Sequence, residues 1–461
     1  MKKHLLLFGL LAVLFASCEN NNDEPENNNE PSINEEYVSI NKCIYDIMSD
    51  YYLWNKHMPR YKKNDDSYPA DFFDSLLYYR EDHWSFISDD SESLNDELAG
   101  SPYSMGYSPQ FWYYNGEENV LIVVEYVYPG SPADRAGLKR GDIILDINGE
   151  RMTPDNYYDL YSKEQATYTL GTYDAARKKL NNDRDISMRA EKVKADPSVY
   201  DTIFMVNNRP VGYYVFTAFT TDDAYYASMD AVFDRFKAAG VKDLILDLRY
   251  NGGGDIETAG HLASAIAPAS VVDNHEVLVT YVYNAGLTKY FKDEGSEDDI
   301  LYRFPENSHN ADIENLFVLA TDGTASASEL VTIGLKPYMN VKLIGTNTYG
   351  KYTGMFVFDN TIEGLEDLRS WALLPVCMKY ANSEGFTDFV DGLTPDYPVD
   401  DELLGGYQFG DDDDPMLAKA LDAVRNLPTT SKAAHINPFR LLGRNRSIVG
   451  NNLIIRPSSL R

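Results

Sequence analysis

The sequence predicts a mixed α/β fold, and three regional patterns carry that prediction. From Pro210 onward, short apolar runs of strand length alternate with stretches of helical periodicity, as in a sheet flanked by helices. Residues 100–192 read instead as short strands between turn residues, and residues 35–99 read as helices. About 430 residues follow the N-terminal segment, which is enough for two or three domains.

The first 18 residues have the pattern of an export signal. A basic start, Met1-Lys2-Lys3, precedes an almost wholly apolar run from Leu5 to Ser17, which is too short to span a bilayer as a helix. Ala16-Ser17-Cys18 resembles a bacterial lipoprotein signal, although Phe15 stands where such signals usually carry leucine. The resemblance implies a lipidated Cys18 and a protein held at the bacterial cell envelope by a lipid anchor only. Secretion without a lipid is the alternative.

The composition limits the partners that we expect. Glu19 to Pro31 contains only Asn, Asp, Glu and Pro, so residues 19–34 are predicted to be a disordered linker. The net charge of −31 argues against nucleic acid, whose phosphates need basic clusters. No Cys/His spacing suggests a metal site, and no cofactor is expected. Beyond Cys18 only Cys43 and Cys377 occur, which leaves one disulfide open.

Residues 35–99 are predicted to form an N-terminal helical segment. Ile40, Ile44, Ile47 and Tyr51 recur three and four residues apart and give one apolar face. A second helix is expected to start near Pro69. We expect this segment to pack on the other domains and to take no part in the chemistry.

Residues 100–192 contain a pattern similar to a known module. The stretch from Ser131 to Gly149 predicts a short helix, a strand and an Asn-Gly turn, and it resembles the centre of a PDZ domain. Upstream, Ser104 is followed by Met105, Gly106 and Tyr107, which resemble the PDZ loop whose backbone N–H groups hold a peptide's terminal carboxylate. A PDZ domain without a ligand is the alternative.

Glycines follow one buried strand of the region 200–427. Leu244 to Arg249 is such a strand, and Gly252, Gly253 and Gly254 come shortly after it. Three glycines let backbone N–H groups turn toward a ligand. The lysine and hydroxyl residue that end a phosphate-binding P-loop are missing, which favours an oxyanion hole.

A serine and a lysine follow the next two predicted strands. Ser326 comes after the strand Leu316–Thr321, at the start of a helix, and Lys351 comes after the strand Val341–Thr346. A serine hydroxyl needs a partner that takes its proton, and a lysine can be that partner when burial keeps it neutral. Parallel strands would bring the two side chains to one sheet edge. Taken singly, the residues also read as a helix cap and a surface lysine.

Two further segments carry weaker predictions. Val271 to Asn310, rich in Tyr, Asp and Glu, is expected to be an insertion over the site. Residues 428–461 form a basic C-terminal tail, with six Lys or Arg and no Asp or Glu after Ser431. This tail is expected either to be disordered or to fold back on the acidic body.

Together and in this order, these motifs resemble the tail-specific, or C-terminal processing, serine peptidases over residues 100–425. The resemblance implies a crotonase-like α/β peptidase core beside a PDZ domain, itself a mixed α+β, partly open β-barrel. It implies Ser326 as nucleophile and Lys351 as general base. It implies backbone N–H groups of Ala327 and of Gly253 or Gly254 as oxyanion donors. Protein or peptide substrates would be recognised by their C-terminal tails, with the PDZ domain gating access.

One residue departs from the family pattern. Many members carry a glutamine four residues after the lysine and use it to orient the amine, whereas this chain has Met355. A thioether is a weak acceptor, so Thr353 or Tyr352 is expected to orient Lys351 instead. Met355 keeps a second hypothesis open, a catalytically weak or inactive lipid-anchored protein that binds peptides in the PDZ groove. A crotonase-type thioester enzyme is a third.

Overall fold

The computed structural model describes residues 33–425, 440–444 and 453–455, apart from residues 115, 175–176, 178 and 296–298. The predicted signal with Cys18 lies outside the described residues, as does the linker up to residue 32. Cys43 and Cys377 are both free thiols.

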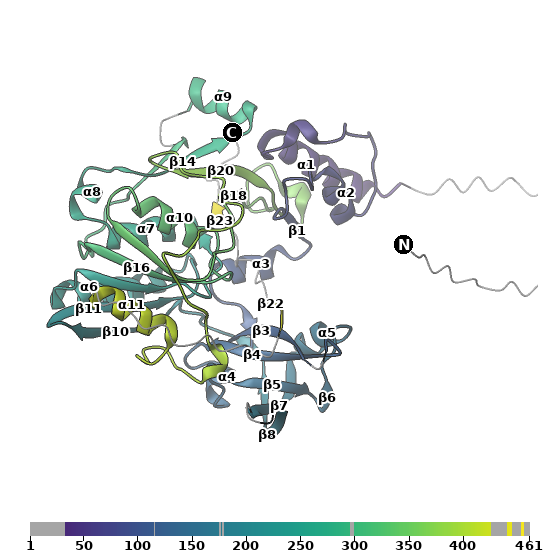
Figure 1. Cartoon of the computed structure of the whole chain (residues 1–461). Helices are drawn as coiled ribbons and strands as arrows, with labels where there is room; N and C mark the ends of the chain where they lie inside the picture. The colour runs from purple at the N-terminus through teal and green to yellow at the C-terminus, as the bar shows by residue number, and fades with distance from the viewer. Residues whose placement is uncertain are drawn as a thin grey trace, which may run out of the picture.

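The N-terminal segment packs against the rest of the protein as predicted, with α1 and α2 side by side in Figure 1. Its elements are α1 Glu35–Tyr51, a 3-10 turn Asn55–His57, α2 Pro69–Leu76, β1 Phe86–Ser88 and α3 Ser91–Leu98. The side chain of Asn34 caps α1, and the apolar faces of both helices join the largest hydrophobic core. β1 pairs with β19 (Ala372–Leu374), so this segment is part of the sheet structure as well.

The region expected to be a PDZ domain forms its own sheet with its own hydrophobic core. Its elements are β2 Tyr103–Ser104, β3 Tyr107–Tyr114, β4 Asn119–Val127, α4 Pro132–Arg135, β5 Ile143–Ile147, β6 Glu150–Arg151, α5 Tyr157–Tyr161, β7 Gln165–Asp174, β8 Lys179–Arg189 and β9 Glu191–Lys192. The strand order is β22-β3-β4-β5-β7-β8, where β22 is Arg440–Arg444 of the C-terminal tail. This region lies at the lower end of the molecule in Figure 1.

The α/β region is built on a six-stranded sheet that is parallel except at one edge. Its order is β10 Ser198–Val206, β11 Arg209–Phe216, β12 Asp243–Asp247, β16 Asn315–Ala320, β17 Asn340–Gly345 and β21 Tyr397–Pro398. One face packs on α6 Asp223–Ala239, α7 Ile256–Ile266 and α10 Ala327–Leu335, and the other packs on α11 Pro415–Arg425. The predicted strands and helices are therefore present, and the mixed α/β class is confirmed.

A second sheet of six strands packs beside the first. Its order is β13 Gly254–Asp255, β23 Leu453–Ile455, β18 Thr353–Phe356, β20 Val376–Asn382, β14 Val277–Tyr283 and β15 Leu301–Arg303. The remaining elements are α8 Ala269–Asp273, α9 Ala285–Asp293 and 3-10 turns at Glu366–Leu368 and Leu403–Gly405. The prediction that residues 271–310 are an insertion over the site is wrong for β14, which pairs with β20 inside this sheet and buries most of its apolar side chains.

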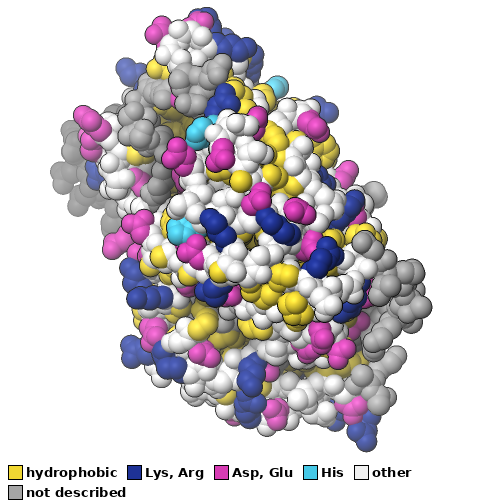
Figure 2. Space-filling view, turned by 90° about the vertical axis from the view of Figure 1, so that its left-hand side faces the viewer, with side chains coloured by type: hydrophobic (Ala, Val, Ile, Leu, Met, Phe, Trp, Pro, Cys, Tyr) yellow, Lys and Arg dark blue, Asp and Glu magenta, His cyan; other side chains and the backbone are white. Residues whose placement is uncertain are grey.

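The C-terminal tail contributes one described strand to each of two sheets, β22 beside β3 and β23 between β13 and β18. Among the described residues, no helix combines the length and the apolar character needed to cross a membrane. The face in Figure 2 carries acidic and basic side chains interspersed, with no continuous basic patch on it.

Candidate active site

Ser326 lies at the junction between β16 and α10, where the sequence places a nucleophile. It is the N-cap of α10 and has φ 59° and ψ −111°, a conformation that is rare for a residue with a side chain. The residue is fully buried, and its Oγ has no hydrogen-bond partner among the described residues. A fully buried serine in a rarely populated backbone conformation is typical of a functional position, and Ser326 holds that position while it also caps α10.

Lys351 follows β17, the neighbour of β16, and is also fully buried. Burial lowers the pKa of Lys351 well below its ordinary value, and the negative charges of Asp82 and Glu329 offset part of that shift. A lysine with such a pKa is neutral over a wider range of pH and can accept a proton. The reading of Lys351 as an ordinary surface lysine is thereby excluded.

Glu329 ties the backbone of both residues together. Its Oε2 accepts the N–H of Ser326 at 2.7 Å and the N–H of Lys351 at 2.9 Å. Its Oε1 accepts the N–H of Gly350 at 2.7 Å and the hydroxyl of Thr348. Burial raises the pKa of Glu329 to about 7, although these four hydrogen bonds favour the carboxylate. The sequence analysis missed this residue; its place three positions after an N-cap serine was the available signal.

Tyr380 of β20 makes a second connection between the two residues. Its hydroxyl lies 2.9 Å from the carbonyl oxygen of Ser326 and 2.6 Å from that of Lys351, and it is the donor to both. The side chain is fully buried. Ser326 and Lys351 are therefore fixed relative to each other by a carboxylate on their N–H groups and a phenol on their carbonyls.

The N-terminal segment reaches the lysine, contrary to the expectation that it has no part in the site. The Lys351 amine lies 5.9 Å from the centroid of the Trp84 ring. Asp82, which is 1% exposed, accepts the Tyr52 hydroxyl at 2.8 Å and the N–H groups of Trp84 and Ser85 at 3.0 Å each. Trp84 therefore lies beside the amine, and the negative charge of Asp82 acts on the pKa of Lys351.

Met355, the residue that departs from the family pattern, faces the lysine directly. The Lys351 Nζ lies 3.7 Å from Met355 Sδ, a weak acceptor. The Oγ1 of Thr353, the residue expected to orient the lysine, is buried without a hydrogen-bond partner among the described residues. The Tyr352 ring packs against Trp84, and the Lys379 amine lies 5.1 Å from its centroid.

The glycine loop after β12 lies against the nucleophile. Gly253 has φ 111°, and a Cβ there would lie 2.9 Å from Ser326 Cβ and 3.0 Å from the Ala327 nitrogen. At Gly254 a Cβ would lie 2.1 Å from the Phe219 carbonyl oxygen. The structure thus brings together the residues predicted for the nucleophile and the oxyanion hole. In this state the Gly253 N–H donates to Asn251 Oδ1 at 2.9 Å.

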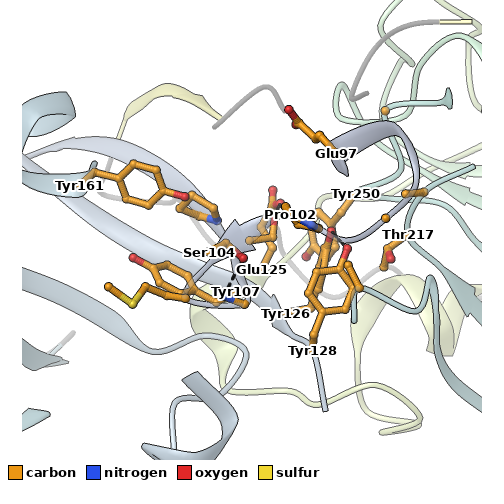
Figure 3. Close-up of a pocket in the computed structure, with 18 of the residues that line it drawn as sticks. Glu97, Pro102, Ser104, Tyr107, Glu125, Tyr126, Tyr128, Tyr161, Thr217 and Tyr250 are labelled. Carbon is orange, nitrogen blue, oxygen red and sulfur yellow. Dashed lines mark hydrogen bonds between the residues drawn. The ribbon is translucent and has the colours of Figure 1, made fainter. Parts of the chain in front are cut away.

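A cavity of about 510 Å³ leads from the predicted PDZ loop to this glycine loop. Met105, Gly106 and Tyr107 line one end, and Gly252 and Gly253 line the other. Figure 3 shows Tyr107 and Tyr161 on one side of the cavity and Tyr126, Tyr128 and Tyr250 on the other, with Ser104 between them. The two predicted binding elements therefore share one cavity.

A buried arginine of the PDZ-like region is anchored in the α/β region. Arg140 donates to the Glu125 carbonyl at 3.1 Å, to Asp401 at 3.1 Å and to the Tyr250 hydroxyl. Tyr250 lies two residues before the glycine run Gly252–Gly254, and its hydroxyl donates in turn to Asp401. Arg249 binds the same Asp401 carboxylate at 3.0 Å. This buried charge network physically joins the two regions beside the site.

Models of known families match three parts of the chain. The N-terminal domain of peptidase family S41 matches residues 39–86, a PDZ domain matches residues 123–166, and peptidase family S41 itself matches residues 210–399. The segment read as structural helices is thus a recognised part of this peptidase architecture, and the PDZ domain is confirmed.

Individual relatives are distant. A "Probable CtpA-like serine protease" of Staphylococcus aureus is 24% identical over 375 residues, which cover 79% of this chain and 66% of that protein. A chloroplastic "C-terminal processing peptidase" of Tetradesmus obliquus is 25% identical over 324 residues, covering 68% of this chain and 63% of that protein. The chain thus spans somewhat under two thirds of the length of these relatives. The crystal structure of a putative S41 protease from Bacteroides fragilis has the same fold, with TM-score 0.68 and 24% identity over 84% of this chain and 97% of that one.

Proposed function

Because the chain belongs to peptidase family S41, we propose that it is a serine endopeptidase in which Ser326 is the nucleophile and Lys351 the general base. The observation that carries the proposal is the shared fixing of the two residues by Glu329 and Tyr380, with the pKa of Lys351 lowered by burial. These shared contacts and the lowered pKa of Lys351 support the assignment of the two roles.

In the proposed reaction, Ser326 Oγ attacks the carbonyl carbon of the scissile peptide while neutral Lys351 takes the hydroxyl proton. The ammonium then gives that proton to the leaving amine, and water hydrolyses the acyl-enzyme by the same proton transfers in the second half. Backbone N–H groups of Ala327 and of the loop Gly253–Gly254 stabilise the oxyanion. The Gly253 N–H can stabilise the oxyanion only after its hydrogen bond to Asn251 Oδ1 breaks. We therefore propose that substrate binding rotates the peptide bond between Gly252 and Gly253.

The substrates in this proposal are proteins or peptides recognised by their C-terminal tails. The loop Met105–Tyr107 binds the terminal carboxylate, and the shared cavity leads the chain toward Gly253. Because Ser326 and Lys351 are fully buried, the described state is closed, and the PDZ domain gates access through the Arg140–Tyr250 contact. We place the enzyme at a bacterial cell envelope, anchored by a lipid on Cys18, and expect substrates among envelope or extracellular proteins.

A lipid-anchored binding protein without turnover is the second candidate. Two observations favour it, the Met355 thioether where an amide would hold the lysine and the Ser326 Oγ without a hydrogen-bond partner. In that case the PDZ groove alone would carry the function.

Cleavage of a loosely folded protein such as reduced casein distinguishes the two candidates. The protein is compared with Ser326→Ala, Lys351→Ala and Lys342→Ala, the last a surface lysine paired with Asp396. Mass spectrometry of fragments is expected to show cleavage by the parent and Lys342→Ala, and none by the other two. Equal cleavage by all four would contradict the dyad. No cleavage by the folded parent, even with an added C-terminal peptide, would support the binding protein.

A further inference from the structure

The tail strand β22 covers an edge of the PDZ sheet that would otherwise be open. In the order β22-β3-β4-β5-β7-β8, β3 has only β4 as a partner from the PDZ domain itself. β22 pairs with β3 antiparallel, with Arg440 opposite Tyr113 and Arg444 opposite Gln110. An open strand edge presents unpaired backbone N–H and C=O groups that another strand can bind. The tail therefore satisfies backbone groups that a peptide ligand would otherwise satisfy.

The direction of β22 is that of a peptide ligand approaching the carboxylate-binding loop. PDZ domains bind peptides by adding an extended strand to a sheet edge. β3 starts at Tyr107, directly after the loop, and antiparallel pairing makes β22 run from Tyr113 toward that loop. The strand occupies the same edge in the same orientation as the ligand that the proposed function requires.

A side chain of the tail also enters the PDZ core. Leu442 is partly buried and packs against the hydrophobic cluster that contains Phe111, as Tyr157 and Tyr161 do. The ring centroids of Phe111 lie 5.1 Å from Tyr157 and 5.4 Å from Tyr161, so α5 and β3 together form an aromatic site beside the strand. Docking of β22 therefore combines main-chain pairing with one apolar anchor, as peptide recognition by strand addition does.

Part of the binding site stays uncovered by the described tail residues. The pairing with β3 ends at Gln110, whereas Met105 to Pro109 line the cavity together with Gly443. The pairing of residues 440–444 therefore covers β3 from Gln110 to Tyr113 and leaves the loop end of β3 without a partner from these five residues.

We propose that residues 440–444 are an internal ligand of the PDZ domain, which an incoming peptide with an aliphatic side chain in the Leu442 position must displace. The inference rests on the proposed function, because it takes the edge of β3 as the peptide-binding edge. It also assigns a role to the basic tail: the tail sets the concentration at which a substrate tail is captured, since an intramolecular competitor is present at high effective concentration.

Peptide binding to the full-length chain carrying Ser326→Ala tests the proposal without any need for cleavage. The probe is a fluorescein-labelled synthetic peptide with the sequence of residues 436–444 and a free C-terminal carboxylate, read by fluorescence anisotropy. Leu442→Glu is expected to lower the Kd of this peptide by ten-fold or more, because it releases the internal competitor. Met205→Glu, which makes the same kind of change at a 66% exposed position outside the PDZ domain, is expected to leave the Kd unchanged.

A reversible disulfide between β22 and β3 provides a second measurement that does not weaken the binding of the tail to the PDZ sheet. Leu441 and Trp112 are directly opposed, and antiparallel partners lie within the Cα separation that a disulfide spans. Leu441→Cys with Trp112→Cys is expected to crosslink on mild oxidation and to abolish peptide binding until dithiothreitol is added. Each single cysteine variant controls for Cys43 and Cys377.

The possible outcomes distinguish a failure of the internal-ligand proposal from a failure of the proposed peptidase function. Equal peptide affinity in the parent and Leu442→Glu, or a disulfide that forms without reducing binding, would overturn the internal ligand. Absence of binding in every folded variant would contradict the peptide-binding edge itself, and with it the inference, while Ser326-dependent cleavage is measured separately.

Discussion

Ser326 and Lys351 donate their backbone N–H groups to the same oxygen atom, Oε2 of Glu329, at 2.7 and 2.9 Å. The proposed nucleophile and the proposed base come from two loops that follow adjacent parallel strands, β16 and β17. Sheet pairing brings the loops to one edge of the sheet. It does not by itself fix the distance between the two side chains as precisely as a proton transfer requires. A single carboxylate that binds both backbones supplies that restraint.

Replacing Glu329 with glutamine is expected to lower kcat by roughly 10- to 100-fold, because small displacements of a nucleophile are costly. The amide offers one acceptor oxygen where the carboxylate accepts four hydrogen bonds, so two donors lose their partner. Steady-state kinetics with a peptide substrate measure the effect, with KM expected to change little. Exposed Glu314→Gln serves as the control. Unchanged kcat in folded Glu329→Gln would show that the carboxylate does not position the dyad.

Adding a methyl group at Gly253 is expected to reduce kcat/KM by about 100-fold or more, the size of effect seen when an oxyanion donor is lost. The new Cβ would lie 2.9 Å from Ser326 Cβ, and φ 111° disfavours any side chain. Gly130→Ala is the matched control, because Gly130 also has positive φ but no atom within 4 Å of the added group. Both variants should lose some stability. Loss of activity in both, or in neither, would contradict a specific role of Gly253.

Replacing Lys351 with methionine is expected to raise the melting temperature at neutral pH while it abolishes activity. The unfolded chain binds a proton on this lysine up to about pH 10, whereas burial lowers the pKa in the folded state. The folded state therefore loses stability as pH falls through this range, and methionine removes that cost. A gain of 1 kcal/mol corresponds to roughly 2–4 °C for a domain of this size.

Differential scanning calorimetry across pH 6 to 10 measures this gain, which should shrink as pH rises. Lys342→Met is the control, because Asp396 raises the pKa of Lys342 and its loss should bring no gain. A lower melting temperature for Lys351→Met at every pH would contradict this prediction. It would mean that the contacts of the Lys351 amine stabilise the folded state by more than burial of the amine destabilises it.

Local sequence pattern predicted most of the dyad's surroundings. The run Leu316–Thr321 and the run Val341–Thr346 each predicted a buried strand, and parallel pairing of the two strands explains why Ser326 and Lys351 lie at one edge. The three glycines predicted backbone N–H groups turned toward a ligand, and Gly253 lies so close to Ser326 that an added Cβ would be 2.9 Å from its Cβ. These predictions depend on periodicity and on residue chemistry within a few positions.

Contacts between distant segments could not be predicted in this way. Trp84 reaches Lys351 from the N-terminal segment, and Tyr380 reaches both dyad residues from another sheet. Neither residue stands in a local pattern that marks it. β22 and β23 are five and three residues long, which is too short for a periodic pattern in the sequence. They form strands because their backbone groups pair with the edge of β3 and with β13 and β18.

The pH dependence of kcat/KM is the most direct test of a neutral Lys351 as the base for Ser326. The account predicts a profile that falls toward acid at an apparent pKa well below the ordinary value of about 10.4 for lysine, and protonation of Glu329, whose pKa burial raises to about 7, adds to the fall. Lys351→Arg should be inactive at every pH, because a guanidinium stays charged. A flat profile from pH 5 to 9, or activity retained by Lys351→Arg, would contradict the account.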